Sequence, residues 1–137
     1  MIDHISVPVK DFEKSRDFYD KTLAVLGFER VLNFEDEKQQ WAGYGRDGRP
    51  SFGIYFRKDT LNEGVGKITG LHVGFLAPNI EALDQWYAKC LELGGTDNGA
   101  PGPRPEYHPG YYGAFIIDPN GWRIEACFQN YQGGLST

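Results

Sequence analysis

Long apolar runs, basic clusters and a cysteine framework are all missing from this chain of 137 residues. A membrane-spanning helix needs about 18 or more consecutive apolar residues, and no such run is present, so no membrane span is expected. The Lys and Arg residues are scattered and the net charge is −5, which argues against binding to nucleic acid. Two cysteines, Cys90 and Cys127, cannot form a disulfide framework, so the expected location is a reducing cytoplasm. Residues 1–4 lack a basic start, so a secretory signal is not expected.

Glycine and aromatic residues are plentiful instead. The chain has 18 Gly, and Phe, Trp and Tyr together make up 15% of it. Short strands, tight turns and an aromatic-lined cavity suit this composition better than a helical bundle does. The length, with 40% apolar and 24% charged residues, predicts one compact domain over residues 1–137.

An internal repeat organises the chain. A shift of 68 positions aligns His4 with His72, and without a gap it also aligns Tyr44 with Tyr112. Several other similar pairs fall at the same shift, which chance explains poorly. We therefore expect two homologous halves, at about residues 1–57 and 68–128, joined by a polar segment over residues 58–67.

Each half predicts the same order of elements. Its first strand, at residues 2–9 or 71–76, is rich in β-branched and aromatic residues. A helix follows, with Asp11 or Asn79 as its N-cap, and three more strands come after it. The result is βαβββ twice, with eight strands and two main helices, which predicts an α+β domain.

Three polar side chains fall on strand faces turned away from the apolar core. Strand alternation places His4 on the other face of its strand from Ile5 and Val7, and His72 likewise on the polar face of its strand. Glu125 falls on the polar face of the last strand. These faces are expected to curve around one cavity. Two imidazoles and one carboxylate there suit a divalent transition metal with open coordination positions. The alternative is that each is an ordinary hydrogen-bonded polar residue.

The turn sequence Asp-Pro-Asn-Gly-Trp-Arg-Ile-Glu at residues 118–125, with both histidines in register, resembles the glyoxalase/bleomycin-resistance/extradiol-dioxygenase (vicinal oxygen chelate) superfamily. The resemblance implies paired βαβββ modules that form a half-open, eight-stranded, barrel-like sheet. It also implies one divalent metal ion (Fe, Mn, Ni, Co or Zn) held by His4, His72 and Glu125, and a substrate that chelates the metal through adjacent oxygens. A homodimer is expected from the same resemblance, with the modules paired within one chain or exchanged between two.

Departures from known subfamilies narrow what the resemblance implies. Glyoxalase I enzymes usually carry a fourth protein ligand in the first half, and the alignment places Tyr55 at that position. Extradiol dioxygenases carry a tyrosine where this chain has Phe115. Fosfomycin-resistance enzymes also use two histidines and one glutamate, whereas bleomycin-resistance proteins generally lack these ligands. Because Tyr55 and Phe115 stand at those two positions, neither a standard lactoylglutathione lyase nor a ring-cleaving dioxygenase is indicated.

A proline-rich segment at residues 99–112 is expected to form a stiff rim around the cavity, because proline lowers the entropy lost on ordering. Arg104 is predicted to bind a substrate carboxylate or phosphate, with Tyr107 and Tyr111 beside it. His108 is predicted to transfer a proton near neutral pH. The alternative is an ordinary connection packed on the barrel rim. Elsewhere, Trp41 and Tyr55 are expected to fill the core, with an aromatic wall of the cavity as the alternative.

These features predict a metal-dependent enzyme that acts on a small, oxygen-rich molecule by lyase, isomerase or oxygenase chemistry. Chelation would lower the pKa of a substrate C–H or O–H group, and His108 or Tyr55 would relay the proton. The alternative from a different class is a non-catalytic protein that sequesters a drug or metabolite. Small molecules are the expected partners, with no nucleic acid and no membrane.

Overall fold

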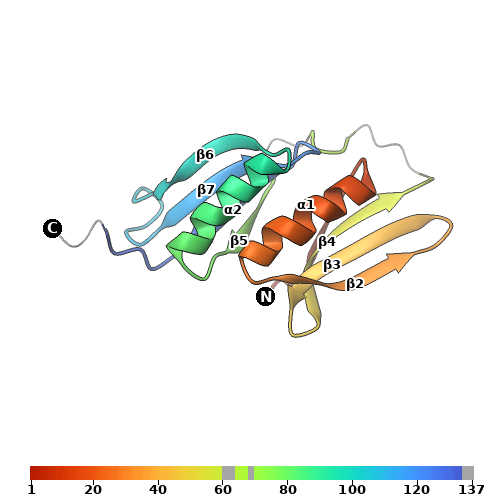
Figure 1. Cartoon of the computed structure of the whole chain (residues 1–137), viewed down its shortest axis with the longest axis horizontal. Helices are drawn as coiled ribbons and strands as arrows, with labels where there is room; N and C mark the ends of the chain where they lie inside the picture. The colour runs from red at the N-terminus through yellow and green to blue at the C-terminus, as the bar shows by residue number, and fades with distance from the viewer. Residues whose placement is uncertain (60–63, 68–69, 134–137) are drawn as a thin grey trace.

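The computed structural model describes residues 1–59, 64–67 and 70–133, and these residues form the predicted βαβββ order twice (Figure 1). The prediction of an α+β fold is confirmed. The first unit consists of β1 (Ile5–Pro8), α1 (Phe12–Val25), β2 (Glu29–Glu35), β3 (Gln39–Arg46) and β4 (Arg49–Arg57). The second consists of β5 (His72–Leu76), α2 (Ile80–Glu92), β6 (Thr96–Pro103), β7 (Tyr112–Ile117) and β8 (Arg123–Phe128).

The eight strands are arranged as two four-stranded sheets that do not close on each other. Their orders are β1-β4-β3-β2 and β5-β8-β7-β6, so each sheet has its first and last strands paired in parallel. One helix covers one face of each sheet, and the two helices lie side by side (Figure 1). The face of each sheet that points away from its helix is called the open face below.

Both helices begin where the sequence predicts. The side chain of Asp11 accepts a hydrogen bond from the Lys14 amide at 3.2 Å, and that of Asn79 accepts one from the Ala82 amide at 2.8 Å. These bonds satisfy amides that lack partners within the first helical turn. Gly94, just after α2, has a φ of +98°, a left-handed conformation that glycine adopts without steric cost.

An aromatic core connects the two units. Tyr19 of α1 packs against Phe52 of β4, with the ring centroids 5.1 Å apart. Phe52 in turn packs against Phe75, at a centroid distance of 5.0 Å. Phe75 lies on β5, so the second unit contributes directly to the core of the first. Edge-to-face and tilted aromatic contacts of this kind add to the stability gained from burial alone.

A buried carboxylate also joins the two units. Asp118, in the turn between β7 and β8, accepts a hydrogen bond from the Tyr19 hydroxyl at 2.6 Å and bonds from the Asn120 and Trp122 amides at 2.9 and 2.8 Å. The Trp122 indole N–H donates to the Pro8 carbonyl at 2.7 Å. The turn that carries the family motif is therefore bound to the end of β1 and to the inner face of α1.

Part of the connection between the halves packs against the same turn. Gly66 has a φ of +74°, and a Cβ built on it would lie only 1.9 Å from the Asn120 carbonyl oxygen. A side chain at this position would have to displace the turn. Of the predicted joining segment, residues 60–63 lie outside the described residues, as do residues 68–69 at the start of the second predicted half.

The strand register corrects one detail of the repeat. In the parallel pairs, Ser6 lies opposite Gly53 and Gly74 lies opposite Glu125. Since Ser6 and Gly74 are repeat partners at the 68-residue shift, Gly53 is the counterpart of Glu125. The expectation that Tyr55 stands at the position equivalent to Glu125 is wrong. The gapless 68-residue alignment of the two halves therefore does not hold for the last strands of each unit.

The second unit is longer than the first because its connection between β6 and β7 contains additional residues. The connection between β2 and β3 spans residues 36–38, whereas that between β6 and β7 spans residues 104–111. The predicted rim at residues 99–112 is also shorter than expected, because β6 continues to Pro103 and pairs with β7.

No helix in the described part of the chain is long and apolar enough to span a membrane. Both cysteines are free, and Cys90 is buried in the core. Burial raises the pKa of the Cys90 thiol, so this side chain is an unreactive core residue.

Replacing Tyr19 with Phe is expected to lower the free energy of unfolding by about 2 kcal/mol at pH 7, because buried Asp118 loses a hydrogen-bond donor and the ring remains. Urea denaturation measures this difference. The matched control is Tyr87→Phe, which removes an exposed hydroxyl–carboxylate bond to Asp97 and should change the value by less than about 0.5 kcal/mol. Equal effects of the two substitutions would contradict a special role for the buried bond.

The same pair predicts a loss of stability in alkali. Burial and the Asp118 carboxylate raise the pKa of Tyr19 well above its ordinary value of 10.0. Above about pH 10 the native state therefore binds more protons than the unfolded state, and stability falls as pH rises. The slope from this group is up to about 1.4 kcal/mol per pH unit. The Tyr19→Phe variant lacks this contribution, so its stability deficit should shrink between pH 10 and pH 12 in urea titrations.

Candidate metal and substrate site

Two of the three predicted metal ligands meet on the open face of the second sheet. The His72 Nε2 atom lies 2.9 Å from Oε1 of Glu125. Their strands are parallel neighbours, and Glu125 is only 5% exposed. Gly74 lies directly opposite Glu125, and a Cβ there would stand 3.3 Å from its Cγ. The absence of a side chain at Gly74 leaves room for the carboxylate between the two strands.

The second oxygen of the carboxylate is held by Tyr111. The Tyr111 hydroxyl donates to Oε2 of Glu125 at 2.5 Å. Partial burial and this hydrogen bond raise the pKa of the phenol, so Tyr111 stays protonated and acts as a donor at neutral pH. Tyr107 and His108 pack edge-on against the Tyr111 ring, at centroid distances of 5.0 and 5.3 Å. The loop at residues 104–111 therefore does reach the site.

His108 has a defined tautomer in this arrangement. Its Nδ1 accepts a hydrogen bond from the Gly110 amide at 3.2 Å, and its Nε2 is in close contact with Oε1 of Gln129. A backbone N–H can only donate, so in the neutral ring the proton resides on Nε2 and is donated to Gln129. The ring is exposed to solvent.

Arg104 lies beside the same site, with part of its hydrogen-bonding capacity already used. Its Nη2 donates to the Ala100 carbonyl at 2.8 Å, and its guanidinium lies 5.4 Å from the Phe115 ring centroid. Phe115 is directly opposite Glu125 in the sheet, so these two side chains share the open face.

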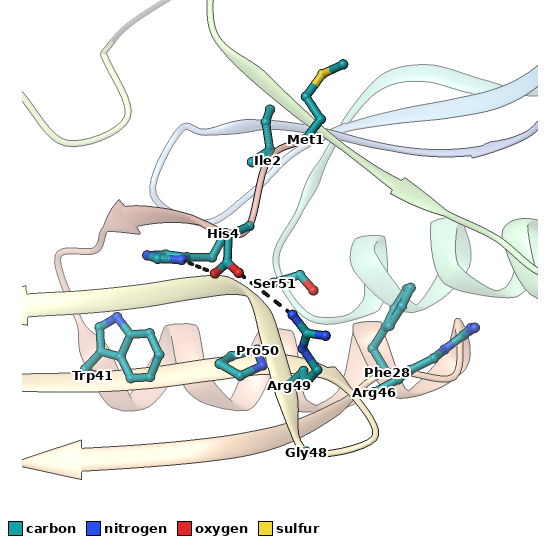
Figure 2. Close-up of a pocket in the computed structure, with 11 residues that line it drawn as sticks. Met1, Ile2, His4, Phe28, Trp41, Arg46, Gly48, Arg49, Pro50 and Ser51 are labelled. Atoms are coloured by element: carbon teal, nitrogen blue, oxygen red, sulfur yellow. Dashed lines mark hydrogen bonds and ion pairs between the residues drawn. The ribbon is translucent and has the colours of Figure 1, made fainter.

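His4 lies elsewhere, just before β1. Its Nδ1 is 2.7 Å from a carboxylate oxygen of Asp3, whose other oxygen is 3.9 Å from Nη2 of Arg49. These residues line a pocket of about 810 Å³ beside the first sheet (Figure 2). Within the residues that the structure describes, no three His, Cys, Asp or Glu side chains gather closely enough to hold a metal ion. One chain alone thus does not bring His4 to His72 and Glu125.

The His72–Glu125 pair fits part of a metal site. It supplies one imidazole nitrogen and one carboxylate oxygen, donor types that suit divalent transition metals, on an accessible sheet face. Tyr111 provides the outer hydrogen bond that commonly orients a ligating carboxylate. A third protein ligand is needed to match the number usual for a catalytic metal.

Tyr55 and Trp41 both lie on the open face of the first sheet. They pair across β3 and β4, and Pro8 of β1 flanks Tyr55 on its other side. Trp41 lines the pocket with His4 and is not part of the buried core, so the expectation that it fills the core is wrong. The structure does not bring Tyr55 together with Glu125 as neighbours in one sheet.

The open faces expose large apolar side chains. Leu32 and Phe34 of β2 pair with Gly43 and Trp41 and so point to the open face of the first sheet. Leu76, on the same face of β5 as His72, is exposed in the second sheet. Exposed apolar side chains that gather on one surface are typical of a contact with a partner or a ligand.

Two residues that contact the site histidines were not predicted: Asp3, beside His4, and Gln129, beside His108. The position of Asp3 directly before His4 was an available signal, since a carboxylate beside an imidazole orients it. The Gln129 contact depends on the path of the 104–111 loop and had no signal in the sequence.

The comparisons with known proteins agree with this architecture. A family model described as the Glyoxalase/Bleomycin resistance protein/Dioxygenase superfamily matches residues 1–126, and the chain therefore belongs to this superfamily. No curated protein matches the chain.

Solved structures give more specific relatives. A glyoxalase/bleomycin resistance protein from Albidiferax ferrireducens T118 is 27% identical, with a TM-score of 0.68 over 91% of this chain and 96% of that one. A glyoxylase/bleomycin resistance protein/dioxygenase domain from Frankia sp. EAN1pec is 16% identical, with a TM-score of 0.71 over 95% and 98%. Glyoxalase I from Zea mays is 18% identical, with a TM-score of 0.65 over 93% of this chain and 45% of that one. The last two likenesses concern the fold alone.

Replacing Tyr111 with Phe is expected to lower the free energy of unfolding by about 1–3 kcal/mol, because the buried Glu125 carboxylate loses a donor. The measurement is urea unfolding of metal-depleted protein. Tyr107→Phe is the matched control, since the exposed Tyr107 contacts the Tyr111 ring rather than the carboxylate. If Tyr107→Phe destabilised the protein as much, loss of a tyrosine hydroxyl in general, rather than loss of the bond to Glu125, would account for the effect.

Proposed function

We propose that the chain is a subunit of a metal-dependent enzyme that acts on a small, oxygen-rich substrate. The observation that carries this proposal is the meeting of His72 and Glu125 at 2.9 Å on an open sheet face, with Tyr111 behind the carboxylate. A bound divalent metal would supply Lewis acidity, lowering the pKa of a substrate O–H or C–H group chelated to it.

The third ligand in this proposal is His4 of a second copy of the chain. His4 is exposed and lies just before β1 of the first sheet, apart from the other two proposed ligands within its own chain. The apolar side chains exposed on the two open faces support the pairing, because a contact between the first sheet of one copy and the second sheet of another would cover them. The proposed assembly is a homodimer with two equivalent sites.

The roles of the remaining residues follow from their positions. His108 packs edge-on against Tyr111, so it would exchange a proton with a substrate held near Glu125 when the bond between its Nε2 and Gln129 opens. Arg104 and Tyr107 lie at the rim of the same face and would contact the substrate. Tyr55, on the open face of the first sheet, would act from the side contributed by the second copy, as a donor or relay.

Elemental mass spectrometry of untagged protein tests metal binding. We expect close to one Fe, Mn, Ni, Co or Zn ion per chain, and loss of the ion in His72→Ala and in His4→Ala. The Lys21→Ala variant, which removes an exposed ion pair with Asp17, is the control and should retain the metal. Retention of metal in both histidine variants would contradict the ligand set.

A mixed dimer tests the shared site. Chains carrying His4→Ala and chains carrying His72→Ala are expected to bind little metal as separate homodimers. A dimer containing one chain of each kind has one intact set of ligands, so metal should return at half the wild-type content. No recovery would show that the three ligands do not come from two copies.

The alternative function is a protein that sequesters a drug or metabolite without turnover. It predicts no metal in any of these samples and none taken up on titration. That outcome would replace the enzyme proposal.

A further inference from the structure

The first sheet carries a flat aromatic surface that depends on two glycines. Gly43 and Gly53 are directly opposite each other on the open face of β3 and β4. A Cβ at Gly43 would lie 2.6 Å from Cη2 of Trp41, and one at Gly53 would lie 2.9 Å from its Cζ2. The six-membered ring of the indole therefore covers the backbone of both glycines. Any other residue at either position would push the ring off the sheet.

The Trp41 side chain also lines a pocket. Trp41 lines the cavity of about 810 Å³ together with His4, Pro50 and Arg49 (Figure 2). A volume of this size suits a small organic molecule. A rigid indole with one face supported by backbone offers its other face for stacking with a planar ring.

Arg49 gives the pocket a cation that a ligand can recruit. Its side chain is 84% exposed, and its contact with Asp3 is long, at 3.9 Å. The same Asp3 carboxylate is held more closely by His4, whose Nδ1 lies 2.7 Å from its other oxygen. A carboxylate on a ligand can therefore bind the guanidinium while Asp3 keeps its bond to His4.

We propose that this pocket binds a planar aromatic carboxylate, with the ring stacked on Trp41 and the carboxylate paired with Arg49. The inference rests on the proposed function in one respect: because His4 forms part of the pocket wall, the reacting end of the ligand would lie beside the shared metal. Binding of the ring and of the carboxylate depends only on residues of the first sheet.

Isothermal titration calorimetry with 2-naphthoate tests the proposal, using metal-depleted protein in EDTA. Trp41→Leu is expected to weaken binding about tenfold through loss of stacking. Arg49→Gln is expected to weaken it by a similar factor, about tenfold, through loss of the charged hydrogen bond. The control Arg30→Gln removes an arginine that pairs with Asp20 on the helix side of the same sheet, and should leave the affinity unchanged.

Two further ligands separate the ring from the charge. 2-Naphthylmethanol keeps the ring, so Trp41→Leu should weaken its binding and Arg49→Gln should not. Cyclohexanecarboxylate lacks a flat ring, so its binding should be weaker than that of 2-naphthoate in the wild type and insensitive to Trp41→Leu. Loss of either selectivity would overturn the proposal.

A glycine substitution tests the support beneath the ring without deleting a contact group. Gly53→Ala in the otherwise wild-type chain is expected to weaken 2-naphthoate binding, because the new methyl would stand 2.9 Å from Cζ2 of Trp41 and displace the ring. Its other near contact, at 2.8 Å, is Oγ of Ser6, a hydroxyl that can rotate away. In the Trp41→Leu background the same substitution should have no further effect. A loss of equal size in both backgrounds would show that the glycine acts through general destabilisation and would contradict the proposed surface.

The two proposals fail separately. If 2-naphthoate does not bind while the metal analysis gives the expected ligands, the aromatic carboxylate is wrong and the metal enzyme stands. If 2-naphthoate binds with the stated selectivity while no variant alters the metal content, the pocket stands and the metal enzyme is wrong.

Discussion

The buried carboxylate of Asp118 is the interaction on which the arrangement of the two units depends. Burial alone would raise its pKa, and a buried charge without partners would be costly. Tyr19, Asn120 and Trp122 supply the donors, and one of them comes from a helix in the other unit. The Asp-Pro-Asn-Gly turn therefore has a structural role that is separate from that of Glu125, the proposed metal ligand that follows it. By fixing the start of β8 against α1 and β1, it sets the position from which Glu125 projects onto the open face.

The placement of glycine distinguishes the two open faces. On the second sheet, Gly74 leaves space for a carboxylate, which makes this face suitable for binding a cation. On the first sheet, Gly53 occupies the position equivalent to Glu125, and the space above it is filled by Trp41. The same backbone repeat thus carries a polar ligand pair on one side and an aromatic surface on the other. A ligand bound between such faces would have a charged, metal-directed end and an apolar, stacked end.

Local patterns in the sequence predicted the fold well. Strand alternation and the caps at Asp11 and Asn79 depend on interactions between near neighbours in the chain, and the structure confirms the caps and the order of elements. The pairing of His72 with Glu125 was also within reach, because the first and last strands of each repeat were expected to contribute to one cavity. The position of Tyr55 was not, since it depended on the length of the 104–111 loop. An insertion in a surface loop changes the alignment of every later strand without altering the hydrophobic pattern.

The contact between Tyr19 and Asp118 joins residues that are 99 positions apart. All four strands of the first sheet are complete once Arg57 has been synthesised, yet the carboxylate partner of Tyr19 is made much later. During synthesis on the ribosome, the first unit therefore emerges with its buried phenol unpaired and one edge of its core lacking Phe75. Long-range contacts of this kind slow folding, because a large loop must close before they form. The nascent first half would thus depend on the second for its full stability, although the two have the same order of elements.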